Sequence, residues 1–164
     1  MPRRGSNLTI RPAGLSDAAV LAALIAGFRD HLAAKVPTDA ALQHLLARAL
    51  TDPTIEFSCA WLDESAVGYT QTRFFMSVWV GGTEAHLDDL FVAAAARGQG
   101  VGRALLRHAV ARAQARGALQ FGLDTNERNE AGQSLYRSAG LSPQSHALYP
   151  GGREVFWVKK IGAD

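Results

Sequence analysis

Residues 90–103 read Leu90-Phe91-Val92-Ala93-Ala94-Ala95-Ala96-Arg97-Gly98-Gln99-Gly100-Val101-Gly102-Arg103. The apolar start is typical of a strand, and the apolar residues after the turn recur at helical spacing. The three glycines between them predict a tight turn that lets a ligand approach the backbone closely. Unpaired N–H groups at a helix start, with the positive end of the helix dipole, form a seat for a pyrophosphate.

Two familiar nucleotide-binding motifs fit this turn badly. A P-loop ends in Gly-Lys-Ser/Thr, whereas Gly102 is followed here by Arg103-Ala104. A dinucleotide-binding fingerprint would place its third glycine at position 103 and normally lies in the first strand–helix–strand unit. A strand-to-helix turn that binds nothing is the remaining alternative.

The pattern of apolar residues predicts strands and helices on both sides of the turn. Strands are expected at 8–11, 55–62, 66–75, 83–92, 119–123, 142–149 and 154–160. Two helices are expected between the first two strands, one after residue 100 and one at 129–139. The order βααβββαβαββ predicts an α/β fold, with a mixed, mostly antiparallel sheet and helices on both faces.

Composition narrows the class of protein. The 164 residues are 48% hydrophobic, which predicts one domain over residues 1–164. The formal net charge of +2 offers little for a nucleic acid, and no apolar run is long enough for a membrane helix. A single cysteine excludes a disulfide framework, and the polar N-terminal residues do not resemble a secretion signal. We therefore expect a cytoplasmic protein without a membrane or nucleic-acid partner.

Two motifs together resemble a known family. Residues 97–102 resemble the Gln/Arg-x-x-Gly-x-Gly/Ala acetyl-coenzyme A signature of the GCN5-related N-acetyltransferases, the GNAT family, and residues 87–92 resemble its cofactor-binding strand. Residues 129–141 resemble its Asn-x-x-Ala-x-x-Leu-Tyr…Gly-Phe element, with Gly132 in place of alanine and Leu141 in place of phenylalanine. The resemblance implies the GNAT fold and an enzyme that moves an acetyl group from acetyl-coenzyme A (acetyl-CoA) to an amine, with no metal.

The resemblance also implies where the coenzyme binds. The backbone N–H groups of residues 98–103 would hold the pyrophosphate, and the strand backbone from Leu90 to Val92 would pair with the pantetheine arm. Asn129 would contact the same arm, and Tyr136 would protonate the departing thiolate. From the residues alone, an aromatic residue beside Leu135 on a helix is most often a core residue, which would describe Tyr136, and Asn129 fits a helix N-cap. Both Arg97 and Arg103 equally fit solvated surface charges.

The base that deprotonates the amine is expected among nearby carboxylates. By resemblance, Asp88 occupies the place of a glutamate in polyamine acetyltransferases, and Asp124 matches a glutamate of ribosomal-protein acetyltransferases. We expect Asp88 to act, through water, with Asp124 second; each could instead be an ion-paired or capping aspartate. In a regular strand His86, Asp88 and Leu90 share one face, although the family often has a bulge there. His86 and Asp88 could form half of a metal site, but no third ligand stands at matching spacing.

The sequence gives less information about the acceptor than about the coenzyme. Residues 73–79 resemble a segment of diamine and aminoalkyl acetyltransferases. The rings of Trp79 and Tyr149, with the carboxylate of Glu84, could hold a small cation or belong to the strand core. We therefore expect a small primary amine, such as a polyamine or diamine, as the partner. Protein N-terminal or lysine acetylation and a non-catalytic acyl-CoA-binding module are the alternatives. Analogy with relatives that pair through their last strands implies a homodimer.

Overall fold

The computed structural model describes residues 7–125 and 128–143 of the chain. The elements follow the predicted order as far as α4. They are β1 (Leu8–Pro12), α1 (Ala18–His31), α2 (Asp39–Ala49), β2 (Ile55–Leu62), β3 (Ser65–Ser77), β4 (Gly82–Val92), α3 (Val101–Ala115), β5 (Gln120–Leu123) and α4 (Glu130–Ser138). The last two predicted strands, at 142–149 and 154–160, lie almost entirely outside the described residues.

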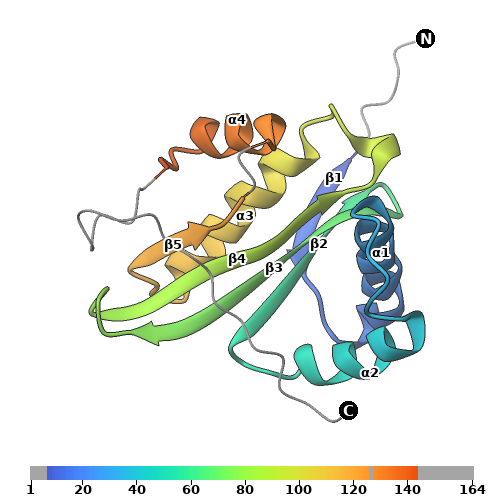
Figure 1. Ribbon diagram of the computed structural model, residues 1–164, viewed down its shortest axis with the longest axis horizontal. Helices are drawn as coiled ribbons and strands as arrows, with labels where there is room; N and C mark the ends of the chain where they lie inside the picture. The colour runs from blue at the N-terminus through green and yellow to red at the C-terminus, as the bar shows by residue number, and fades with distance from the viewer. Residues whose placement is uncertain (1–6, 126–127, 144–164) are drawn as a thin grey trace.

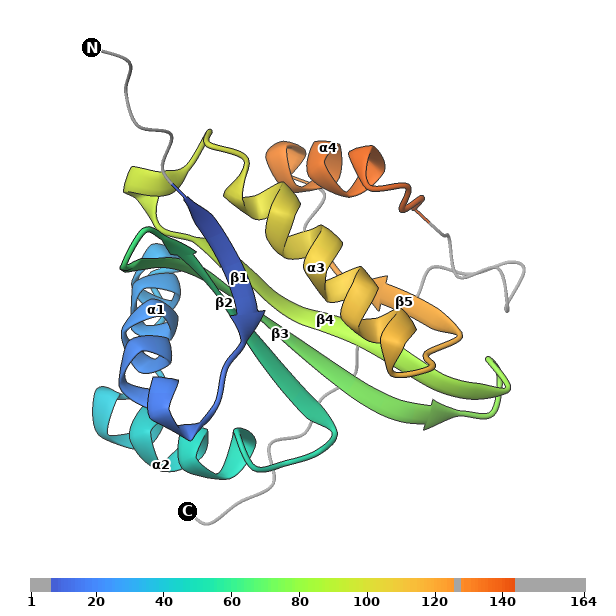
Figure 2. The same ribbon diagram turned by 180° about the vertical axis from the view of Figure 1, so that it is seen from behind.

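The strands form one mixed sheet in the order β1-β2-β3-β4-β5. Only β4 and β5 run parallel; the other neighbours are antiparallel. Helices α1 and α2 lie on one face of the sheet, and α3 and α4 lie on the other (Figure 1, Figure 2). The predicted fold class, a mostly antiparallel mixed sheet with helices on both faces, is therefore confirmed.

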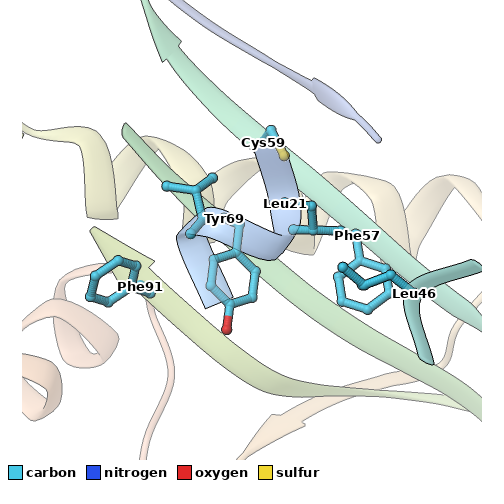
Figure 3. Packing of buried hydrophobic residues seen from close by; sticks show 7 residues of the cluster. Leu21, Leu46, Phe57, Cys59, Tyr69 and Phe91 are labelled. Atoms are coloured by element: carbon cyan, nitrogen blue, oxygen red, sulfur yellow. The ribbon is translucent and has the colours of Figure 1, made fainter. Parts of the chain in front are cut away.

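Apolar side chains fill both faces of the sheet. On the α1 side, Tyr69 is fully buried and lies between Phe91 and Phe57 (Figure 3). On the α3 side, Leu106 packs against Leu87 of β4. The single cysteine, Cys59, belongs to the first cluster, and burial raises the pKa of its thiol to about 11. Cys59 is therefore a core residue and not a nucleophile.

Polar contacts fix α3 across the sheet. The guanidinium of Arg112 donates two hydrogen bonds of 2.8 Å to the carboxylate of Glu56 on β2. His108 Nε2 lies 3.2 Å from the hydroxyl of Ser58 on the same strand. Because both pairs lie between helix and sheet, they restrain the rotation of α3, and with it the direction in which the N-terminus of the helix points.

A β-bulge lies in the middle of β4. The register with β3 steps from Gln71↔Asp89 to Thr72↔Leu87, so Asp88 is an extra residue in β4. The bulge turns the side chains of both Asp88 and Asp89 toward residues of one face of β3. Asp88 contacts Arg73 and Asp89 contacts Tyr69, so the alternation of a regular strand does not hold here.

Candidate active site

Strands β4 and β5 part halfway along β4. Their pairing runs only from Glu84↔Gln120 to Leu87↔Leu123, whereas β4 continues to Val92. Among the described residues, no strand covers the edge of β4 beyond Leu87. The Ala93 N–H donates to the Val67 carbonyl of β3 at 2.8 Å, so the backbone groups of Leu90 and Val92 point toward the open edge. This edge can pair with an extended ligand.

The glycine turn leads from this open edge into α3. Gly98 and Gly100 have φ angles of +75° and +82°, a left-handed conformation that other residues adopt only with strain. Gly100 is the N-cap residue of α3, and no side chain caps the helix. Within residues 7–125 and 128–143, the backbone N–H groups of 98–103 have no protein acceptor. The turn therefore presents a row of free donors at the positive end of a 15-residue helix.

Two exposed arginines flank the turn. The Nε atom of Arg97 donates to the Val92 carbonyl at 3.0 Å, so this side chain folds back along the strand. Arg103 is in the first turn of α3, which has no acidic residue. A cation there is unfavourable for the isolated helix, because the helix dipole is positive at this end. An anionic ligand would reverse that penalty.

Helix α4 begins differently. Asn129 is its N-cap: Oδ1 accepts the Gly132 N–H at 3.0 Å, and Nδ2 donates to the Thr125 hydroxyl at 3.1 Å. A Cβ atom at position 132 would collide with Asn129 Nδ2, which explains why glycine suits this position. The capping role of Asn129 is therefore confirmed, and contact with a coenzyme stays a prediction.

Tyr136 lies between the core and a cleft. Its ring is half-buried against Leu87, Leu106 and Ala109, and it also lines a cavity of about 760 Å³ beside β5. Burial raises the pKa of the Tyr136 phenol, and a hydrogen bond with Thr125 acts in the opposite direction. The phenol therefore keeps its proton at neutral pH and can donate it. Both interpretations of this residue, core position and proton donor, fit its surroundings.

The cleft also contains a cluster of acidic groups around a histidine. Glu84, His86 and Asp124 line it together with Tyr136. His86 Nε2 is 3.3 Å from Asp124 Oδ2 and 4.0 Å from Asp88 Oδ1. Sequence reasoning considered His86 only as half of a metal site. Its register opposite Gly122 in the parallel β4–β5 pair, which places it at the point where the strands part, could not be read from the sequence.

The carboxylates of the site have unlike surroundings. Asp88 accepts hydrogen bonds of 2.5 and 2.7 Å from Arg73, and a third of 3.3 Å from Gln71. Asp89 accepts a 3.0 Å hydrogen bond from the Tyr69 hydroxyl, and burial raises the pKa of this carboxyl. Asp124 is 86% exposed. Of the two predicted bases, one is therefore ion-paired and the other is in water.

The predicted acceptor residues do not gather in one place. Glu84 lines the cleft, whereas Trp79 is 79% exposed in the turn between β3 and β4 and does not line the cleft. Tyr149 lies outside the described residues. Over the described part of the chain, no group of three or more histidine, cysteine, aspartate or glutamate side chains is placed to hold a metal ion. None of the described helices is long and apolar enough to cross a membrane.

Comparison with known proteins identifies the class to which this fold and site belong. The model of the acetyltransferase (GNAT) family matches residues 24–141. This range contains most of the sheet, the glycine turn, α3 and α4. The chain therefore belongs to the GNAT family of acetyltransferases.

Solved structures agree with this fold. The crystal structure of a "probable acetyltransferase" has a TM-score of 0.81 at 23% identity, covering 93% of this chain and 99% of that one. Aminoglycoside N-acetyltransferase AAC(6')-Iy, in complex with CoA, has a TM-score of 0.78 at 20% identity, covering 98% and 100%. Ribosomal-protein-alanine N-acetyltransferase from Brucella melitensis biovar Abortus 2308 has a TM-score of 0.69 at 22% identity, covering 93% and 100%. At these identities the likeness establishes the fold.

Proposed function

We propose that the protein is an N-acetyltransferase that transfers the acetyl group of acetyl-CoA directly to a primary amine of a small, cationic molecule such as a diamine or polyamine. The observation that carries the proposal is the row of free N–H donors at residues 98–103, continuous with the open edge of β4. Family membership supports acetyl-CoA as the ligand for which these donors are placed.

The coenzyme would bind mainly to backbone. The N–H groups of residues 98–103 would hold its pyrophosphate, with Arg97 and Arg103 beside them. The backbone groups of Leu90 and Val92 would pair with the pantetheine arm, as an added strand pairs with a sheet edge, while those of Phe91 between them face β3. A backbone-bound arm has a defined direction along β4, toward the point where β4 and β5 part.

The acceptor end of the cleft favours a positive charge. Two carboxylates, those of Glu84 and Asp124, line the cleft against one guanidinium, that of Arg137. Asp88 does not line it: this carboxylate lies 4.0 Å from His86 Nε2 and pairs with Arg73. An ammonium group is attracted to such surroundings, and a carboxylate-bearing acceptor is repelled. A neighbour named as an aminoglycoside N-acetyltransferase supports a small amine. A neighbour named for ribosomal-protein alanine supports a second candidate, a protein N-terminus.

Each residue of the site would take part in a different step of acetyl transfer. Acetyl-CoA supplies a thioester, which an amine attacks only after it loses a proton. The Leu90 N–H, which points into the open edge, would hydrogen-bond the thioester carbonyl. Tyr136 would give its proton to the departing sulfur, and Glu84 and Asp124, which line the cleft, would stabilise the incoming ammonium.

A thiol-release assay with acetyl-CoA tests the proposal. We expect CoA release that depends on an added diamine or polyamine and exceeds the release with alanine-terminated peptides. Calorimetry in the absence of amine should show binding of acetyl-CoA. Binding without turnover on any amine would support an acyl-CoA-binding module, and preference for peptides would support the protein acceptor. Failure to bind acetyl-CoA would overturn the proposal as a whole.

A further inference from the structure

We propose that His86 is the general base that removes the proton from the acceptor amine, and that Asp124 positions its ring. This inference rests on the proposed N-acetyltransferase function and names a residue for one of its steps. It revises the expectation that Asp88 acts as the base. Three observations carry it: the place of His86 where the strands part, the unequal surroundings of its two ring nitrogens, and the engagement of the competing carboxylates.

His86 lies where an amine could approach the coenzyme edge. It is the third residue of the paired stretch from Glu84 to Leu87, directly before β4 separates from β5. Its side chain is 21% exposed and lines the same cleft as Tyr136. A base and an acid that line one cavity can both reach the reacting groups bound there. The base would act on the amine nitrogen, and the acid on the sulfur of the thioester.

The two nitrogens of the ring have different neighbours. Nε2 faces carboxylates, with Asp124 Oδ2 at 3.3 Å and Asp88 Oδ1 at 4.0 Å. Nδ1 faces Gly122, which has no side chain; a Cβ atom built there would lie 3.8 Å from Nδ1. A carboxylate beside Nε2 favours the tautomer with the proton on Nε2, which leaves Nδ1 free to accept one from the cleft.

The competing carboxylates are less suited to this step. Both oxygens of Asp88 already accept hydrogen bonds from Arg73, and Gln71 donates a further one. Asp124 is 86% exposed and lies 3.3 Å from His86 Nε2, so it is placed to orient the imidazole. The charged groups near His86 or in its cleft are Glu84 and Asp88 on β4, Arg73 through Asp88 from β3, Asp124 after β5, and Arg137 on α4.

The proton balance of the step closes without a further reactant. The ammonium group gives one proton to His86 Nδ1, and the free amine forms an N–C bond to the acyl carbon as the C–S bond breaks. The sulfur takes the proton of Tyr136, and the second proton lost by the nitrogen as it becomes an amide restores the phenol. His86 then releases its proton to water through the open cleft. The sum is an ammonium ion and a thioester giving an amide, a thiol and one proton.

The test compares His86→Gln with His44→Gln, an exposed histidine on α2 that serves as the matched control. We expect His86→Gln to lower kcat about 10²-fold or more near neutral pH, the usual scale of general-base catalysis. Its activity should partly recover at alkaline pH, where amines lose the proton unaided. Calorimetric affinity for acetyl-CoA should not change, and His44→Gln should match the wild type in every respect.

Asp124→Asn tests the positioning role. By NMR, the ring ¹⁵N shifts of His86 should show a smaller share of the tautomer with the proton on Nε2 in this variant, because the carboxylate beside Nε2 is lost. The expected loss in kcat is smaller than that of His86→Gln. If the wild type turns over amines and His86→Gln keeps its kcat and pH profile, the inference about His86 fails while the proposed function stands. If the wild type neither binds acetyl-CoA nor acetylates any amine, the proposed function itself fails.

Discussion

Helices α3 and α4 lie on the same face of the sheet but begin in opposite ways. Helix α3 begins at Gly100, in a left-handed conformation, with no side chain on its N-terminal N–H groups. Helix α4 begins at Asn129, whose side chain accepts the Gly132 N–H. The first helix start is open to a ligand, and the second is closed by the protein itself.

The difference suggests a division of labour between the two helices. A helix start with glycine at the N-cap loses only a few tenths of a kcal/mol relative to one with a side-chain cap, and a ligand can supply the missing contacts. We infer that α3 binds through its backbone and α4 acts through a side chain, Tyr136. The inference predicts that substitutions at the start of α3 change affinity, whereas substitution of Tyr136 changes the rate of the chemical step.

The largest effect is expected for Tyr136→Phe. Loss of the hydroxyl should lower kcat roughly 10²- to 10³-fold, the usual scale for removal of a general acid, with little change in affinity for acetyl-CoA. Because burial raises the pKa of Tyr136, the wild type should keep its proton donor well into the alkaline range. Its kcat should fall only at high pH, and this alkaline limb should vanish in the variant. A variant with wild-type kcat but weakened binding would remove the proposed division between the helices.

A smaller effect, on affinity, is expected for Gly100→Ala. The left-handed φ of +82° strains alanine by roughly 1–2 kcal/mol, and relief of that strain would turn the N–H donors away from the ligand. We expect the calorimetric Kd for acetyl-CoA to rise about tenfold, which corresponds to about 1.4 kcal/mol. Gly81→Ala is the matched control, because Gly81 has a φ of +81° and equally open space in the β3–β4 turn. The Gly81→Ala variant should lose similar stability and keep its affinity for acetyl-CoA. A raised Kd in both variants would indicate general destabilisation.

This comparison also shows which features the sequence reveals. The order of elements, the glycine turn and the Asn129 cap were predictable, because each depends on local periodicity, positive φ or a short side-chain-to-backbone bond. Backbone sites of this kind are formed by residues that are contiguous in the sequence. The glycine turn at residues 98–103 is therefore the part of the proposed site that sequence alone could locate.

The acceptor end depends on contacts between distant residues and was less predictable. The extra residue Asp88 in β4 turns two neighbouring aspartates to one face, and Arg73 then pairs with the residue expected to be the base. His86 meets Asp124 only because β5 pairs with β4 in one particular register. The aromatic Trp79 looked like a ligand for a cation but lies exposed in a turn. Neither register nor turn geometry follows from residue type.

Paired substitutions at Asn129 separate capping from binding. Asn129→Ala removes the cap and should cost about 1 kcal/mol of unfolding free energy, measured in urea. Asn129→Asp keeps an acceptor for the Gly132 N–H and should keep most of that stability. Both variants lose the amide donor. If this donor contacts the pantetheine arm, its loss should raise the Kd for acetyl-CoA two- to fivefold in both variants, roughly the contribution of one neutral hydrogen bond. An unchanged Kd in Asn129→Asp would restrict this residue to its capping role.

The smallest effect is expected for Arg103→Gln, and it should have opposite signs in the free and bound protein. A cation in the first turn of α3 opposes the helix dipole, so its removal should stabilise the free protein by a few tenths of a kcal/mol. The same change should weaken the affinity for acetyl-CoA two- to threefold at low salt. This loss of affinity should shrink as salt is added, because Arg103 is exposed. Arg107→Gln, one turn further along the same helix and also exposed, is the control that should leave the Kd unchanged. Equal losses in both variants would mean that the helix attracts the anion through its overall charge. A loss at Arg103 alone would locate the phosphate groups at the uncapped start of α3.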